Sequence, residues 1–198
     1  MLWVAFGVVM ALVVGAAIWG AVAETRSHGS AAAPPAGGGS GQSGVNQGQT
    51  TVVTASDKKS QLTVPASWKD VPPSFREELA VIQLGDLRRE QYVVVVTLDR
   101  DDFEDFDAFS AAMLEGAQHA LDDAAVSEPR NLTIGGLQAV QYEISGKAEG
   151  IKIVFWYTMV AGKNGFYQVV AWTLPSKRTE AEPTITEVIN SFRELGAA

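Results

Sequence analysis

Six carboxylates lie within twelve residues, in the segment LDRDDFEDFDAF from Leu98 to Phe109. Carboxylates at such density can bind calcium, but an EF-hand loop needs oxygen ligands at its first, third and fifth positions and a glycine at its sixth. A loop starting at Asp99 has Phe103 in its fifth position, and one starting at Asp101 has Phe103 in its third. Neither register supplies the ligands, so we predict no metal site in this segment.

The same carboxylates fit the beginning of a helix. Asp102 has the side chain of an N-cap, and Glu104 and Asp105 then fall in the first turn, where the helix dipole favours negative charge. A helix predicted over 103–121 carries one apolar stripe, formed by Phe106, Phe109, Met113, Ala117 and Ala120. We therefore interpret the acidic segment as the start of a helix that packs on a core.

Other residue types give little support for catalysis. The chain has no cysteine, which excludes disulfides, thiolate nucleophiles and cysteine-based metal sites. His119 is the only histidine after His28, and we interpret it as a surface residue on the polar face of the predicted helix. Serine-hydrolase, zinc-protease and Walker motifs are missing from the sequence. We predict no catalytic residue and no cofactor; an enzyme using carboxylates such as Asp99 or Asp101 is the least favoured alternative.

Aromatic side chains crowd two neighbouring predicted strands, at 150–161 and 165–174. Such rings can line a pocket for an apolar or sugar ligand. The candidates for a ligand or partner surface are Trp156, Tyr157, Tyr167 and Trp172. Packing inside the core under a covering helix is the favoured interpretation of these rings. Only the tertiary structure can separate the two.

Most elements around these residues are predicted strands. Alternating or β-branched runs occur at 50–56, 60–65, 77–86, 91–99, 126–134, 136–147, 150–161 and 165–174. The runs on either side of Arg88 and Arg89 predict a hairpin, and the last three runs, with Gly135-Gly136 before them, predict a meander. Both faces of the run at 150–161 are apolar, so layers should cover both faces of the sheet.

An amphipathic helix is predicted to close the chain at 182–195. Its apolar positions are Ile185, Val188, Ile189, Phe192 and Leu195. Thr184 and Glu187 have the spacing of a capping box just after Pro183.

Three segments divide the chain. Leu2–Ala23 carries no charge and as a helix would span roughly 33 Å, so we predict residues 1–23 to be a transmembrane signal anchor. A cleaved signal peptide is the alternative, because the residues before Glu24 fit a small-x-small cleavage pattern. Residues 24–48 are a Gly/Ser/Ala/Pro-rich flexible linker, and 49–198 form one domain, which we place outside the cytoplasm.

The formal net charge of −8 lies wholly beyond residue 23. An acidic domain of this kind repels nucleic acid and anionic lipid headgroups. The longest basic runs are the pairs Lys58-Lys59 and Arg88-Arg89. We predict no nucleic-acid binding, and headgroup contact would need a local basic patch that the sequence does not reveal.

Three segments together resemble one family: LTVPASWKDV with Val64, Pro65 and Trp68, the strand pair NLTIGGLQAVQYEISGK, and EPTITEVINSFREL. They are similar to the PsbP-like superfamily, especially LpqN-type exported lipoproteins of bacteria. The resemblance implies an α+β fold, an α/β/α sandwich around a central, mostly antiparallel sheet, with a non-enzymatic binding or assembly role. The chain lacks the lipid-bearing cysteine of LpqN-type proteins, so its membrane anchor would be the Leu2–Ala23 helix.

These observations predict a membrane-tethered, extracytoplasmic accessory domain that binds a protein or cell-envelope partner without catalysis. The alternative function is a carrier of a small lipid or glycan ligand in a pocket lined by the sheet aromatics. The alternative location is secretion after signal cleavage.

Overall fold

The computed structural model describes residues 48–71, 76–148 and 150–196. The transmembrane helix predicted for Leu2–Ala23 lies outside the described residues, as does the predicted linker up to residue 47. Among the described helices, none is long and apolar enough to cross a membrane. The anchor and the linker therefore stay predictions.

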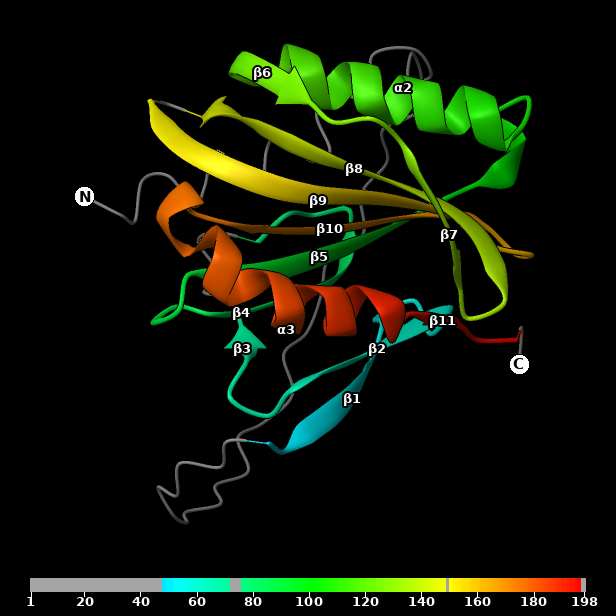
Figure 1. Cartoon of the computed structure of the whole chain (residues 1–198). Coiled ribbons are helices and arrows are strands. Elements are labelled where there is room, and N and C mark those ends of the chain that lie inside the picture. Colours follow the sequence, from blue (N-terminus) through cyan, green and yellow to red (C-terminus); the bar gives the residue numbers. More distant parts are fainter. Residues whose placement is uncertain (1–47, 72–75, 149, 197–198) are drawn as a thin grey trace, which may run out of the picture.

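An eight-stranded antiparallel sheet forms the centre of the described structure (Figure 1). Its strands follow the order β3-β4-β5-β10-β9-β8-β6, and β7 also pairs with β8. The elements are β1 Thr50–Thr54, β2 Ser60–Pro65, β3 Lys69–Asp70, β4 Ala80–Asp86, β5 Gln91–Leu98, η2 Arg100–Asp102, α2 Phe106–His119, β6 Asp122–Val126, β7 Arg130–Ile134, β8 Leu137–Ala148, β9 Ile151–Ala161, β10 Phe166–Thr173, η3 Pro175–Lys177, α3 Arg178–Asn190 and β11 Arg193–Glu194. Short connections and antiparallel pairing place this fold in the α+β class.

The predicted hairpin and the predicted meander are both present. β4 and β5 pair on either side of the turn at 87–90, with Leu84 opposite Val93. β8, β9 and β10 are consecutive neighbours, and Trp156 at the centre of β9 lies opposite Glu143. Gly135 and Gly136 have φ angles of 61° and 81°, in the left-handed region that glycine adopts without strain. The tight turn predicted from these two glycines is confirmed.

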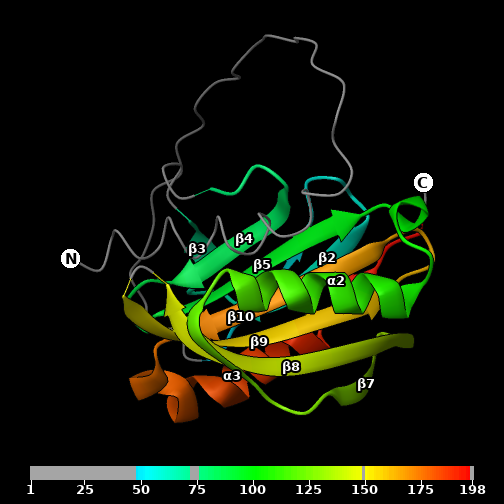
Figure 2. The same cartoon turned by 90° about the horizontal axis from the view of Figure 1, so that it is seen from above.

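Two helices cover opposite faces of the sheet. Figure 2 looks down onto α2, with α3 on the far side of the strands. Phe109 of α2 packs in a core with Phe155, and Ile185 of α3 packs in a second core with Trp156. Phe155 and Trp156 are neighbours on β9 and point to opposite faces, as the period of a strand requires. The expectation of layers on both faces, drawn from the doubly apolar strand, is confirmed.

The acidic segment does begin a helix, but the capping residue differs from the prediction. Asp99 caps the 3₁₀ turn η2 by accepting a hydrogen bond from the amide of Asp101 at 3.2 Å. Asp105, and not Asp102, is the N-cap of α2, and it accepts the amide hydrogen of Ala108 at 2.8 Å.

Aromatic packing explains why α2 begins at Phe106 rather than at residue 103. The ring of Phe109 stacks on Phe166 of β10 with centroids 4.8 Å apart, and Phe106 lies 5.9 Å from the same ring. Phe103 also reaches Phe166, at 6.1 Å, from outside the helix. Several aspartates could cap locally, and the docking of these rings on the sheet selects Asp105.

The C-terminal helix departs further from its prediction. α3 begins at Arg178, so Pro183 and Thr184 lie inside it and the predicted capping box with Glu187 cannot form. Pro183 has no N–H and therefore removes one helical hydrogen bond. Contacts from distant residues stabilise the earlier start, because the Arg178 guanidinium binds Glu143 on β8.

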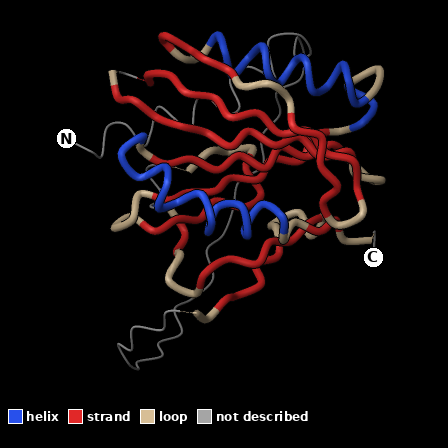
Figure 3. The backbone as a smooth tube through the Cα atoms, viewed as in Figure 1, coloured by secondary structure: helices blue, strands red, loops and turns tan. Residues whose placement is uncertain are grey.

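The chain leaves α3 after Asn190, earlier than predicted. Phe192 is fully buried outside the helix, and Arg193–Glu194 form β11, which pairs with β2. β1, β2 and β11 make a separate three-stranded sheet, seen below the main one in Figure 3. Phe192 and Leu195 continue the apolar spacing of the helix. Periodicity alone therefore predicted a helix that ends at residue 195 instead of Asn190.

The strand predicted at 126–134 is present only as β7, Arg130–Ile134, and Val126 is the last residue of a separate strand, β6. β6 and β7 both pair with β8, at opposite ends of that long strand. Pro129 lies between them and cannot donate a backbone hydrogen bond to a ladder.

Candidate functional site

The four aromatic residues predicted as a ligand or partner surface lie in the two cores, and their exposed fractions are between 0% and 3%. Tyr157 and Trp172 belong to the core under α2, whereas Trp156 and Tyr167 belong to the core under α3. The sheet therefore separates them into two pairs. None of the four lines the cavity beside the turn at 87–90 or the cavity near the β8–β9 turn. As a ligand surface, the set stays a prediction.

The residues weighed for catalysis or metal binding are exposed. Asp99 and Asp101 lie at the surface in the η2 turn, where Asp99 is a cap. His119 is exposed in the last turn of α2. No group of three or more His, Asp or Glu side chains in the described part of the chain is placed to hold a metal ion. The acidic segment serves the local architecture.

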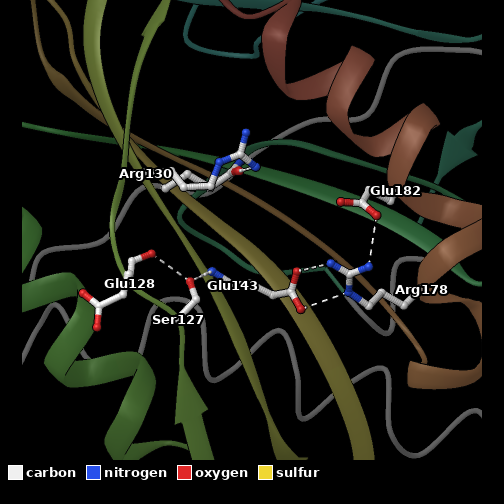
Figure 4. A network of polar contacts seen from close by, with 7 residues as sticks. Ser127, Glu128, Arg130, Glu143, Arg178 and Glu182 are labelled. Carbon is white, nitrogen blue, oxygen red and sulfur yellow. Dashed lines mark hydrogen bonds and ion pairs between the residues drawn. The ribbon is translucent and has the colours of Figure 1, made fainter.

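A polar network joins α3 to β8 (Figure 4). Arg178 donates two parallel hydrogen bonds to Glu143, at 3.0 Å and 2.7 Å, and a third to Glu182 at 3.0 Å. The hydrogen bonds to Glu143 raise the pKa of Arg178 above its usual value. The guanidinium also lies 5.9 Å from the ring centroid of Trp156. Because its donors are used inside the protein, we interpret this network as a clasp between helix and sheet.

A cavity of about 540 Å³ opens where β3 pairs with β4, beside the turn at 87–90. We call it the hairpin cavity; it is lined chiefly by Lys69, Val71, residues 85–89 and Tyr92. Its volume lies in the range of pockets for small ligands, about 300–1,000 Å³. A second cavity of about 390 Å³ near the β8–β9 turn includes Lys147 and Asp123, which form an ion pair with each other at 2.5 Å.

Charges around the hairpin cavity are unevenly paired. Asp86 is 9% exposed and binds the Arg89 guanidinium at 3.0 Å, while its other oxygen accepts the backbone N–H groups of Arg88 and Arg89. Within the part of the chain that the structure describes, the side chains of Lys69 and Arg88 have no carboxylate within ion-pairing distance. Lys69 instead donates to the carbonyl of Ala66 at 3.2 Å.

An aromatic wall closes one side of the hairpin cavity. The ring of Tyr92 stacks on Trp172 with centroids 5.3 Å apart. A Cβ at Gly85 would come within 2.4 Å of the Tyr92 ring, so only glycine allows this ring position. Burial, together with the nearby carboxylates of Glu90 and Asp86, raises the pKa of Tyr92 to about 12. Tyr92 is therefore neutral at physiological pH.

Sequence reasoning did not identify Lys69, Arg88 and Tyr92 as one set. The sequence placed Arg88 in a hairpin turn and in one of the two short basic pairs. Lys69 reaches the cavity because it pairs opposite Gly85, which in turn pairs opposite Tyr92. The two-residue strand β3 is too short to give a periodic signal, so no local pattern pointed to this arrangement.

The fold is similar to those of solved structures. The fold resembles cyanobacterial PsbP (CyanoP) from Synechocystis sp. PCC 6803, with a TM-score of 0.55 over 79% of this chain and 98% of that chain, at 11% identity. LpqN from Mycobacterium tuberculosis, described as involved in cell envelope biogenesis, gives a TM-score of 0.51 over 75% of this chain and 91% of that chain, at 17% identity. The chain has the PsbP-like fold.

The structure confirms the fold that the resemblance of three sequence segments implied. No protein family and no curated protein matches the sequence itself. At identities of 11% and 17%, the structural similarity establishes the fold alone. The function of this PsbP-like domain has to be argued from its own surface.

Proposed function

We propose that this chain is a membrane-tethered binding domain of the bacterial cell envelope that engages its partner without catalysis. The observation that carries the proposal is the hairpin cavity, which combines an aromatic wall with two cationic side chains that have no carboxylate partner among the described residues. The fold shared with LpqN, described as involved in cell envelope biogenesis, supports the location. The partner is a protein or another envelope component.

The Leu2–Ala23 segment would anchor this domain, with the domain outside the cytoplasm. A Gly-rich linker of 24–48 would then span about 25–30 Å and let the domain move near the bilayer. Intact-mass measurement of the protein from membranes tests whether residues 1–23 are retained. Protease added to intact cells should digest the domain. Loss of residues 1–23 would instead support secretion after signal cleavage.

Cross-linking of the full-length chain in its native membranes tests the binding role. We expect Arg88→Glu to lose specific cross-linked envelope partners, because it reverses the charge at the cavity. Lys163→Glu makes the same charge change in the β9–β10 turn, at the other end of the sheet, and should keep them. Partners retained equally by both variants would exclude the cavity as the contact, and a measured turnover would overturn the non-catalytic role.

A carrier of a small lipid or glycan ligand is the second candidate function. The observation that favours it is the Tyr92 ring on the cavity wall, which is backed by Trp172. Mass spectrometry of small molecules that remain with the purified full-length chain tests this role. Tyr92→Ala should release such a molecule, and a protein purified with none would count against a carrier.

A further inference from the structure

The cationic groups at the hairpin cavity form a local positive surplus. Of its charged side chains, Asp86 is neutralised by Arg89, and Asp70 lies 3.6 Å from Arg76. Lys69 and Arg88 remain, each exposed and without a carboxylate partner among the described residues. Among the described residues, two cations at the cavity are therefore unpaired, and the five charged side chains that line it sum to +1, on a chain whose formal net charge is −8. This is the local basic patch that the sequence alone did not reveal.

The chemical identity of these two cations favours a phosphate group. Arginine binds phosphate through paired N–H donors, and lysine binds it as a point charge. A phosphate monoester carries about −1.5 to −2 at neutral pH, which matches the two positive charges. The negative net charge of the domain opposes binding at long range, so an anion is held only where it forms direct contacts with both cations.

The other side of the same cavity is apolar. Val71 and Tyr92 line it and are 3% and 8% exposed, and Leu87 at the hairpin tip is 52% exposed. An exposed leucine beside Arg88 gives the rim both a charged and an apolar contact. A ligand that fills about 540 Å³ would place an apolar body against these side chains.

We infer that the hairpin cavity binds a phosphate group carried on an apolar body. Lys69 and Arg88 contact the phosphate, and the ring of Tyr92 contacts the apolar part. Asp86 fixes the turn so that the Arg88 backbone is held at the rim. The inference rests on the proposed binding function and names the ligand class. The phosphate can belong to a soluble ester or to a membrane lipid headgroup, which share this chemistry.

Calorimetric titration of the full-length chain in phosphatidylcholine nanodiscs with phenyl phosphate tests the site. We expect saturable binding that Lys69→Gln and Arg88→Gln each weaken at least about tenfold, because each variant removes a charge-assisted hydrogen bond. Lys163→Gln makes the same charge change at the far end of the sheet and should bind normally. Circular dichroism checks that the variants remain folded, which their exposed positions favour.

Two further probes test the apolar half of the site. Inorganic phosphate should bind at least about tenfold more weakly than phenyl phosphate, since it makes no contact with Tyr92. Tyr92→Leu should reduce that difference. Equal affinity for both anions in the unchanged protein would overturn the apolar half of the inference.

Nanodiscs that contain phosphatidic acid, a lipid with a phosphate monoester headgroup, distinguish the two sources of phosphate. A lipid ligand would shift the amide resonances of Arg88 and Lys69 without any added ester, and Leu87→Ser would weaken that response. Identical spectra in both kinds of nanodisc, with binding of phenyl phosphate retained, would assign a soluble ester. No response to either probe would overturn the inference, while a partner still captured through Arg88 would leave the proposed function standing.

Discussion

Asp99 and Asp105 each cap a different helical segment within one acidic run. A cap needs a side-chain oxygen within reach of an unpaired amide, and both residues meet that need at 3.2 Å and 2.8 Å. Two of the six carboxylates in the run therefore have a structural role as caps. The negative charge of Asp107 in the first turn of α2 adds to the favourable interaction with the helix dipole.

Because Asp105 is the N-cap of α2, its removal should destabilise the fold more than removal of a neighbouring carboxylate. We expect Asp105→Ala to lower the free energy of unfolding by about 1 kcal/mol, because the Ala108 amide loses its acceptor. Asp102→Ala removes the same charge without a capping bond and should change it by less than about 0.5 kcal/mol. Urea denaturation measures both values, and equal losses would contradict the assignment of the cap.

Three buried tyrosines make the stability of the fold depend on pH in the alkaline range. Burial raises the pKa of Tyr92 to about 12, and it raises the pKa values of Tyr157 and Tyr167 further. In the unfolded chain tyrosines ionise near about pH 10, while the folded protein keeps these protons. The unfolded state then binds fewer protons, so stability falls as pH rises above about 10.

Urea unfolding at pH 9 and at pH 11 should reveal this loss. Each tyrosine that ionises only in the unfolded chain costs up to about 1.4 kcal/mol per pH unit. Tyr157→Phe should show a smaller fall than the unchanged protein, although it also loses the hydrogen bond that Gln168 donates to Tyr157. Stability that stays level between these pH values would disprove the linkage.

At the scale of elements, the beginning of α3 is determined by a strand far away in sequence. Arg178 occupies the first position of the helix and binds Glu143 in β8 through its Nε and Nη2 donors. Helix periodicity predicted a start at residue 182, because Pro183 and Thr184 match a local capping signal. The bidentate contact and the burial of Ala181 favour the longer helix.

A double-mutant cycle on Arg178 and Glu143 tests the clasp. Both side chains are about one third exposed, so solvent screening limits their coupling to about 0.5–1 kcal/mol. The more exposed pair Lys177 and Glu180, 3.4 Å apart, is the control and should show coupling near zero. Comparable coupling in the two pairs would mean that the clasp does not order the start of α3.

At the scale of the whole molecule, the central strands serve both cores. Phe155 and Trp156 of β9, and Val169 and Val170 of β10, alternate between the α2 side and the α3 side. Neither layer can lose its packing without exposing one face of the shared strands. The two helices should therefore unfold together.

Ile185→Ala provides a test of that cooperativity from one side of the sheet. It should cost about 2–5 kcal/mol, because Ile185 is fully buried and the deletion leaves a cavity. Denaturation followed by circular dichroism and by tryptophan fluorescence should give one coincident, shifted transition. Separate transitions for the two signals would show that the α3 layer unfolds independently.

Local signals were sufficient for much of this architecture. The β4–β5 hairpin, the β8–β10 meander and the doubly covered sheet follow from alternation, turn residues and strand period, which act between near neighbours. The helical role of the acidic run also follows from short-range capping. The turn and capping contacts among these features join residues that are close in sequence.

The tertiary structure alone decided which residues meet. Lys69 joins Arg88 and Tyr92 only through the pairing of β3 with β4, and α3 begins at Arg178 only because Glu143 lies across from it. The buried positions of Trp156, Tyr157, Tyr167 and Trp172 likewise depend on which helix covers which face. Long-range strand pairing depends on side-chain packing over the whole sheet, and a short segment of sequence holds only a few of the residues involved.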